Sequence, residues 1–487
     1  MEGSPGFDCD AAGTCPPLVK RMSNDRIGSS FRDPSGFLFR KDGRIQRQIN
    51  RSYGDDYDLL MSSGLYDSLT DKGWLIRHAE VQVEEQTSAY KIIQPEQVSY
   101  ISYPYEWSFS QLKDAALLTM DIQIEALKHG MHLKDASAYN IQFHSGRPVL
   151  IDTLSFERYQ QGKPWQAYKQ FCQHFLAPLA LAAFTDFRLL RLLQTFIDGI
   201  PLDLASRMLP RRTWLRYSLL AHIHLHARAQ RRYEDVGKDR GSSVQASLRA
   251  SQLEGLMISL RDAVRNLVWK NAISEWGDYY QDTNYADESM EHKEHLISTF
   301  LREHKPNSAP TLADFGANTG RFSRIASGEG YFVLAHDIDA IAVDKNYRES
   351  VERSERSILP LLQDLTNPSP AIGWANQERM SFAERNKVDV GMALALIHHI
   401  CVANNVPMKM AAEFFSSLCA MLIIEFVPKS DSQVARLLAT REDIFPDYHE
   451  EGFEDAFRRY FTILSAEKLR GSERTLYLLE RRSEATN

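Results

Sequence analysis

Apolar residues in the second half of the chain form short runs that alternate with longer amphipathic segments. From residue 306 onward, runs of aliphatic residues with strand character are interleaved with segments of helical character. This alternation predicts a parallel sheet wrapped by helices. Two more strand-like runs follow near the C-terminus, separated by the turn-forming sequence RGSE. The expected strands are TLADF, YFVLAHD, ILPLLQD, VDVGMALAL, MLIIEFV, FTILSAEKL and RTLYLLERR.

The first half of the chain shows two other patterns. Runs such as FLFRKDGRIQRQI and VLIDTLSF mix strand-like and helical character, which predicts a compact α+β domain over residues 36–175. Helical spacing in WLRYSLLAHIHLHA predicts a helical connector over residues 176–305. The most apolar stretch, FLAPLALAAF, is too short to be a transmembrane segment and is expected to be a buried helix. Residues 1–35 are expected to form a disordered tail.

Length and composition bound the number and the class of domains. A chain of 487 residues exceeds what one hydrophobic core normally supports, so two or more compact units are expected. The net charge of −7 gives no general attraction for phosphate backbones, and nucleic acid is therefore disfavoured as a partner. The five cysteines show no CxxC or Cys/His pairing, which indicates neither a disulfide framework nor a metal site and favours a cytoplasmic location.

A glycine turn follows the first strand of the predicted parallel sheet. The strand runs into DFGANTG, which begins at Asp314, and a helix is expected to begin near Arg321. Ligands of open α/β sheets bind beyond the carboxyl ends of the strands, where Gly316 and Gly320 allow the backbone to approach them closely. GANTG has only two glycines, whereas the fingerprint that cradles a pyrophosphate needs three. No pyrophosphate is implied.

Acidic residues end the next two strands. Asp337 in HDID is placed to accept hydrogen bonds from both ribose hydroxyls of a nucleoside. Asp364 in QDL can accept the adenine amino group, while the backbone N–H of Leu365 donates to the ring. Each acid alone is common turn chemistry, and Asp339 is expected only to cap the next helix. Three acids ending three successive strands, with the glycine turn after the first, nevertheless predict a nucleoside cofactor.

These motifs resemble those of a known class of enzymes. LADFGANTGRFS, AHDID, LLQDL and MALALIHHI are similar, in order and spacing, to the successive motifs of class I S-adenosylmethionine methyltransferases. NPSPAIGWANQER, IIEFVPKSD and REDIFPDY resemble a narrower group, the NoeA-type nodulation methyltransferases, and this likeness extends from about Gly36 to the C-terminus. The resemblance implies a Rossmann-like, seven-stranded sheet over residues 306–487, closed by the C-terminal hairpin, with S-adenosylmethionine as cofactor. By the same resemblance Asp314, Gly316, Asn318 and Gly320 form the methionine-side loop, Asp337 holds ribose and Asp364 holds adenine.

Two adjacent histidines are candidates for a catalytic base. Methyl transfer to oxygen or nitrogen requires removal of a proton, and His398 and His399 end the fourth predicted strand of the sheet. A role in packing or capping the following helix is equally compatible with either, and His398 ranks slightly ahead. The asparagine-proline-proline-aromatic signature of base methylation is absent. This absence disfavours methylation of DNA or RNA bases. The leading hypothesis is an acceptor that is a small molecule, a glycan or a lipid-linked intermediate.

Two further segments are candidates for contact with substrate. Glu425 and Lys429 follow the fifth strand, although a charged loop is more often merely solvated. Residues 276–288, WGDYYQDTNYADE, are expected to fold over the cofactor as a lid, with Tyr280, Asn284 and Tyr285 as contacts. The alternative is that these tyrosines only pack the connector helices.

The α+β domain carries a second resemblance. Asp135, Asn140 and Asp152 match the spacing of the catalytic Asp, the metal-binding Asn and the second metal-binding Asp of kinase-like phosphotransferases. His132 is offset from the usual HxD, no DFG follows, and no glycine-rich loop is found. A kinase-like scaffold is therefore expected. The competing functions are a phosphotransferase with a methyltransferase-like regulatory module and a non-catalytic protein that binds S-adenosylmethionine.

The connector also carries a basic cluster. Such runs are usually solvated helix faces, and a minority bind anionic partners. The cluster consists of Arg207, Arg211, Arg212, Arg216, Arg228, Arg231 and Arg232.

Overall fold

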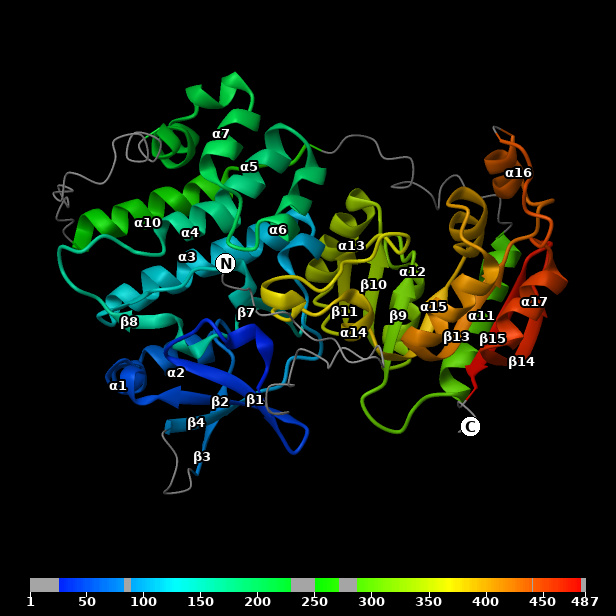
Figure 1. Cartoon of the computed structure of the whole chain (residues 1–487), viewed down its shortest axis with the longest axis horizontal. Coiled ribbons are helices and arrows are strands. Elements are labelled where there is room, and N and C mark those ends of the chain that lie inside the picture. Colours follow the sequence, from blue (N-terminus) through cyan, green and yellow to red (C-terminus); the bar gives the residue numbers. More distant parts are fainter. Residues whose placement is uncertain (1–25, 83–88, 229–249, 271–286, 440, 483–487) are drawn as a thin grey trace, which may run out of the picture.

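The computed structural model describes residues 26–82, 89–228, 250–270, 287–439 and 441–482. Figure 1 shows the N-terminal half on the left and a large sheet flanked by helices on the right. The expected lid contacts Tyr280, Asn284 and Tyr285, together with Arg231 and Arg232, lie outside the described residues.

A small antiparallel sheet and one long helix dominate the N-terminal half. The sheet has the strand order β1-β2-β4-β3, and α3 begins with a capping box in which Ser108 and Gln111 satisfy each other's backbone N–H groups. The elements are β1 (Gly36–Lys41), β2 (Arg44–Asn50), α1 (Gly54–Ser62), α2 (Leu65–Asp71), β3 (His78–Val81), β4 (Ala89–Pro95), α3 (Phe109–Lys128), β5 (Met131–Leu133), β6 (Ile141–His144), β7 (Arg147–Leu150) and β8 (Phe156–Arg158).

Folded structure begins before the boundary expected at residue 36. The short helix η1 (Gly28–Ser30) precedes β1, and the Ile27 N–H donates to the Leu38 carbonyl at 2.9 Å. Because β1 is an edge strand, this segment pairs with backbone groups that would otherwise face solvent. Any tail is therefore shorter than the sequence indicated.

The described parts of the connector consist mainly of helices. FLAPLALAAF contains α5, whose residues from Ala177 to Ala182 are buried, and α10 packs along α3. None of the helices within the described ranges is both long and apolar enough to cross a membrane. The elements are α4 (Tyr168–Phe171), η6 (Cys172–Leu176), α5 (Ala177–Phe184), η7 (Phe187–Arg191), α6 (Leu192–Thr195), α7 (Leu202–Met208), η8 (Arg211–Leu215), α8 (Tyr217–Leu219), η9 (Leu220–Leu225), α10 (Ala250–Arg265) and α11 (Asp287–Glu303).

The C-terminal sheet has seven strands in the order β11-β10-β9-β12-β13-β15-β14. Neighbouring strands are parallel except around β15, which is antiparallel to both β13 and β14. All seven strands predicted from the sequence are present, and the last two form the expected closing hairpin. The strands are β9 (Thr311–Phe315), β10 (Phe332–Asp337), β11 (Ile358–Leu362), β12 (Val388–Ala393), β13 (Cys419–Phe426), β14 (Phe461–Lys468) and β15 (Thr475–Arg481).

Helices cover both faces of this sheet. Along β9, Leu312 belongs to the buried cluster that contains Phe322 of α12, whereas Ala313 belongs to the cluster that contains Phe415 of α15. This alternation follows from the two-residue period of a strand. The helices are α12 (Arg321–Gly328), α13 (Ala340–Glu352), α14 (Phe382–Arg385), α15 (Met408–Leu418), α16 (Ser432–Leu438) and α17 (Glu450–Arg458).

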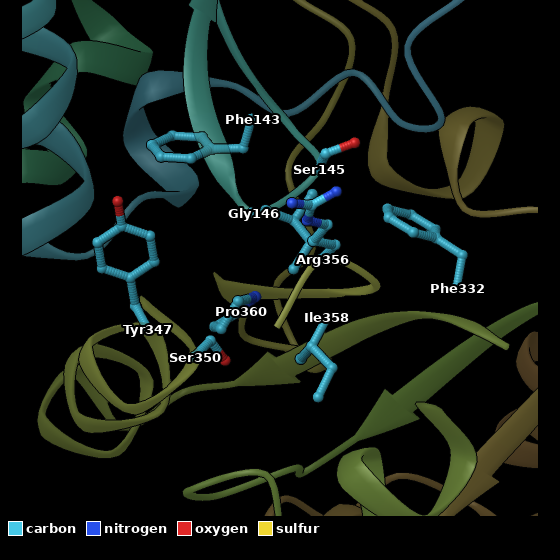
Figure 2. Close-up of a pocket in the computed structure, with 10 residues that line it drawn as sticks. Phe143, Ser145, Gly146, Phe332, Tyr347, Ser350, Arg356, Ile358 and Pro360 are labelled. Atoms are coloured by element: carbon cyan, nitrogen blue, oxygen red, sulfur yellow. The ribbon is translucent and has the colours of Figure 1, made fainter. Parts of the chain in front are cut away.

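The two halves pack closely at the β11 edge of the large sheet. Figure 2 shows the tip of the β6–β7 hairpin above β11, with Phe143 and Tyr347 on one side. Their rings lie 5.7 Å apart, edge to face. A Cβ on Gly146 would lie 2.3 Å from the Glu355 carbonyl oxygen, so only glycine permits this approach. Nearby, the Gln111 amide donates to the Pro360 carbonyl of β11 at 3.0 Å.

Candidate functional site

The glycine turn after β9 is a tight loop in which every second residue has a left-handed backbone conformation. Gly316, Asn318 and Gly320 have φ values of +80°, +50° and +84°. The N–H groups of Gly316 and Ala317 both donate to the His336 carbonyl, at 2.8 and 2.9 Å, which fastens the loop to the end of β10. Such backbone conformations favour glycine and asparagine, which explains the GANTG sequence.

Asp337 holds this loop through its carboxylate. One oxygen accepts the Asn318 N–H at 2.7 Å and the other accepts the Asp339 N–H at 2.8 Å. Burial raises the pKa of Asp337 to about 6. Each carboxylate oxygen has a second lone pair, so the group can also accept ligand hydroxyls. Asp339 caps α13 by accepting the N–H groups of Ile341 and Ala342, which confirms the capping role predicted for it.

Asp314 lies beneath the same loop. Its side chain is 2% exposed and accepts the Ser323 hydroxyl at 2.6 Å. Burial, together with the nearby charge of Asp337, raises the pKa of Asp314 to about 7. The loop therefore contains two desolvated carboxyl groups that ligand hydroxyl or ammonium donors would stabilise in their charged form.

The third predicted acid follows the adjacent strand. Asp364 accepts both the N–H and the hydroxyl of Thr366, at 2.9 and 2.6 Å, and Leu365 beside it is partly exposed. The Gln363 N–H donates to the Asp337 carbonyl at 2.7 Å, so the ends of β10 and β11 lie side by side. The structure thus brings the cofactor residues predicted from sequence to one edge of the sheet.

The two histidines differ in their access to solvent. His398 is 1% exposed, and within the described part of the chain its Nδ1 atom has no hydrogen-bond partner. His399 is partly exposed and begins η11 (His399–Ala403), and the two rings lie 4.1 Å apart. Burial, and then the charge of Arg474, lowers the pKa of His399, while burial and the neighbouring His399 lower that of His398. The lowered pKa keeps both rings neutral at pH 7, and the partly exposed His399 is the one that solvent reaches.

Glu425, expected on the rim, is fully buried beneath this turn. One carboxylate oxygen accepts the Lys293 ammonium at 2.6 Å and the Ala395 N–H at 2.8 Å. The other lies 3.5 Å from the Arg474 guanidinium. Ala395 has a φ of +48°, a strained value for a residue with a side chain, so Glu425 anchors the strained turn that leads to the histidines.

Neither Lys293 nor Arg474 is among the residues predicted from the sequence. Arg474 lies in a charged turn, where it has no distinguishing pattern. Lys293 gave a readable signal, because it lies three residues after Met290 and four before Ile297 on the buried stripe of α11. A lysine in such a stripe requires a buried anion as its partner.

Lys429 secures a loop beside the site. Its ammonium donates to both carboxylate oxygens of Asp443, at 2.8 and 2.7 Å, and to the Phe445 carbonyl at 2.7 Å. Within this ion pair the Lys429 side chain is partly exposed and the Asp443 side chain is exposed. The geometry gives Lys429 a role in holding the loop that follows β13.

The kinase-like triplet also comes together, away from the large sheet. The Asn140 amide donates to the Ser155 hydroxyl, which donates to Asp152 at 2.8 Å. Burial, and then the charge of Asp152, raises the pKa of Asp135. Arg47 of β2 lies 2.5 Å from the other oxygen of Asp152, so a guanidinium already neutralises this carboxylate. Within the described residues, no group of three or more His, Cys, Asp or Glu side chains could hold a metal ion.

No protein-family model matches the chain. Nodulation protein NoeA of Rhizobium meliloti (strain 1021) is 35% identical over 465 residues, which cover 94% of this chain and 96% of that protein.

Similar solved structures cover less than half of the chain. Magnesium protoporphyrin IX methyltransferase ChlM from Synechocystis PCC 6803, with bound S-adenosylhomocysteine, is 16% identical, with 42% of this chain and 93% of that chain covered and a TM-score of 0.31. N-methyltransferase NodS from Bradyrhizobium japonicum WM9 is 10% identical. The match covers 40% of this chain and 98% of the NodS chain, with a TM-score of 0.30. WbdD is 12% identical at a TM-score of 0.30, and the match spans 43% of each chain, less than half of WbdD.

Proposed function

The chain belongs to the NoeA family of nodulation proteins, and from this premise we propose that it is an S-adenosylmethionine-dependent methyltransferase. The acceptor in this proposal is a small molecule, a glycan or a lipid-linked intermediate. One observation carries it: the left-handed loop after β9 and the acids ending β10 and β11 meet at the carboxyl edge of the sheet. The antiparallel β15, inserted between β13 and β14, separates this sheet from that of dinucleotide-binding dehydrogenases.

The residues at this edge fit the cofactor. Asp337 would accept the ribose hydroxyls through its free lone pairs, and Asp364 with the Leu365 N–H would bind adenine. The loop from Asp314 to Gly320 would take the methionine side, where a buried carboxyl of raised pKa suits an ammonium group. When bound, S-adenosylmethionine supplies an electrophilic methyl group on its sulfonium.

The base in this proposal is His399. It is neutral, partly exposed and placed at the start of η11, after the turn that follows β12, so it can take a proton from an acceptor hydroxyl or amine. His398 is buried against it and orients its ring, which reverses the slight preference drawn from sequence. Loss of a general base costs about 10²- to 10⁴-fold in rate. His399→Ala should therefore lower transfer of labelled methyl groups to a cell extract within this range at unchanged affinity for S-adenosylhomocysteine, while the exposed His304→Ala should not.

Calorimetric titration with S-adenosylhomocysteine tests the cofactor pocket. The unmodified chain should bind, whereas Gly316→Arg and Asp337→Ala should lose most affinity, because one fills the loop and the other removes the ribose acceptor. Gly328→Arg is the matched control, since a side chain there meets open space. Equal binding by all three variants, each folded by circular dichroism, would contradict the proposal.

The N-terminal half acts in this proposal as a kinase-like scaffold that shapes the acceptor site. Arg47 already neutralises Asp152, the residue that would have to bind a metal ion. Adding ATP with Mg²⁺ should therefore give this half no protection against heat. A rise in melting temperature, or ATP turnover that Asp152→Ala abolishes, would favour the phosphotransferase alternative instead.

A further inference from the structure

One surface of the connector combines basic and apolar side chains in a way that methyl transfer does not use. Residues 204–233 contain seven arginines and no Asp or Glu, in a chain whose net charge is −7. On the described part of this segment, Leu215 is 90%, Tyr217 80% and Leu225 48% exposed. We call the exposed group of Arg211, Arg212, Leu215, Arg216, Tyr217, Leu225 and Arg228 the arginine–leucine surface.

The arginines of this surface lack acidic partners among the described residues. The Arg212 guanidinium donates to the Phe184 carbonyl, and that of Arg216 lies 4.7 Å from the Phe184 ring. Arg228 lies over the Trp214 ring at 4.5 Å. Two described acids of the connector are engaged elsewhere, because Asp203 pairs with Arg207 and Asp186 with Arg188. The surface therefore carries concentrated positive charge.

The backbone holds these side chains outward. Pro210 follows α7, and the buried Thr213 hydroxyl donates to the Pro210 carbonyl at 2.7 Å and lies 2.9 Å from Nε2 of His224. Trp214 stacks on the same histidine at 4.3 Å. Because Thr213 and Trp214 are fixed inward, the following Leu215 is fully presented to solvent. Figure 1 places the adjoining α7 at the upper left, far from the seven-stranded sheet.

We propose that the arginine–leucine surface docks the protein on an anionic lipid membrane. Leu215 and Tyr217 enter the interface, where burying apolar area is favourable and a tyrosine keeps its hydroxyl in the headgroup layer. The four arginines bind lipid phosphates through their guanidinium forks. A single-stranded nucleic acid stacks its successive bases on several aromatic faces. Among the described residues of this surface only Tyr217 offers an exposed ring, because Trp214 is already covered by His224 and Arg228.

Co-sedimentation of the full chain with vesicles tests this assignment. The chain should bind vesicles of equal parts phosphatidylglycerol and phosphatidylcholine, and should not bind phosphatidylcholine alone. The triple variant Arg211→Ala, Arg212→Ala, Arg216→Ala should lower the partition coefficient about 100-fold, because each arginine near an anionic surface contributes about fivefold. Leu215→Ser with Tyr217→Ser should lower it at least about tenfold. Ile444→Ser, which removes a 60% exposed isoleucine elsewhere, should not change it.

Heparin binding distinguishes a membrane-docking surface from a site that binds any polyanion. The Leu215→Ser, Tyr217→Ser variant should keep the weak, salt-sensitive heparin binding of the parent, while its vesicle partition coefficient falls. A vesicle partition coefficient that this variant leaves unchanged, equal binding of the parent to neutral vesicles, or RNA binding that displaces the vesicles would overturn the proposal. Gly316→Arg should lose affinity for S-adenosylhomocysteine but keep vesicle binding. The vesicle experiment therefore tests the membrane proposal independently of the proposed methyl transfer.

Discussion

At the scale of single residues, the buried charges of Lys293, Glu425 and Arg474 below the strand ends are connected to one another. Glu425 receives Lys293 from α11, the Ala395 N–H from the turn after β12 and the guanidinium of Arg474 near the C-terminus. Three distant parts of the chain therefore depend on one carboxylate. Burial lowers the pKa of Lys293 while the charge of Glu425 raises it, so removing Glu425 leaves the ammonium without its principal counter-charge.

Glu425→Gln should destabilise the protein by about 3–5 kcal/mol, because it leaves a buried charge uncompensated. Denaturant unfolding measures this loss. Glu451→Gln is the control, since that carboxylate is 86% exposed in its ion pair with His449 and surface pairs contribute about 0–1 kcal/mol. Combining Glu425→Gln with Lys293→Met should recover part of the stability. A double variant less stable than Glu425→Gln alone would contradict the network.

Residue identity at the cofactor edge could be predicted because strand ends and tight turns restrict sequence strongly. Gly316 and Asp337 lie at positions where backbone conformation and the ends of parallel strands dictate the residue. The environment of Glu425 could not be predicted, because its burial depends on α11 and on the turn before β15, far away in sequence. His398 and His399 are adjacent in sequence, and only tertiary packing shows which of them solvent reaches.

At the scale of elements, buried histidines fasten the connector helices. His174 on η6 and His222 on η9 are both buried, and Nδ1 of His222 lies 2.8 Å from the Tyr168 hydroxyl. Burial lowers the pKa of His174 to about 3 and that of His222 to about 4. These helices therefore pack around rings that are neutral when folded. The amphipathic pattern predicted the helices, whereas the histidine contacts required the packed arrangement.

The connector should lose stability as pH falls below about 6.5. An unfolded histidine binds a proton with a pKa of about 6.5, whereas folded His222 stays neutral down to about pH 4, so within this window the unfolded state binds more protons. Melting curves between pH 8 and pH 4.5 should show this fall, and His222→Gln should flatten it. The exposed His304→Ala is the control. An unchanged pH profile for His222→Gln would assign the loss to other groups.

Two carboxyl groups at the edge that carries the proposed cofactor site change stability with pH in the opposite direction to the histidines. Burial raises the pKa of Asp337 to about 6 and that of Asp314 to about 7, so the folded state binds more protons between about pH 4 and these values. These carboxyls destabilise the folded domain at neutral pH, and their protonation at lower pH removes this destabilisation. A ligand that donates hydrogen bonds to them should accordingly bind more tightly at pH 8 than at pH 5.

At the scale of the whole molecule, the N-terminal half contacts the segment beside the strand that carries the proposed ribose acid. Arg385 forms a buried ion pair with Glu106 and also donates to the Tyr100 hydroxyl at 2.8 Å. The next residue, Asn386, lies 3.1 Å from Nε2 of His336, which immediately precedes Asp337 in β10. A continuous line of contacts therefore joins the segment before α3 to the proposed ribose acid. Neither half's sequence pattern indicated this junction, because its partners are more than 250 residues apart in the chain.

Breaking this junction should weaken cofactor binding without touching the pocket. Glu106→Gln leaves the buried Arg385 guanidinium without its carboxylate, at a cost of about 3–5 kcal/mol, and it frees the segment that carries Asn386 and supports β10. Calorimetry with S-adenosylhomocysteine should show reduced affinity in the variant that is still folded. Arg188→Ala is the control, because its ion pair with Asp186 in the connector is exposed on both sides and its loss should leave affinity unchanged. If Glu106→Gln lowers the melting temperature while leaving affinity unchanged, the junction stabilises the two halves but does not position the ribose acid.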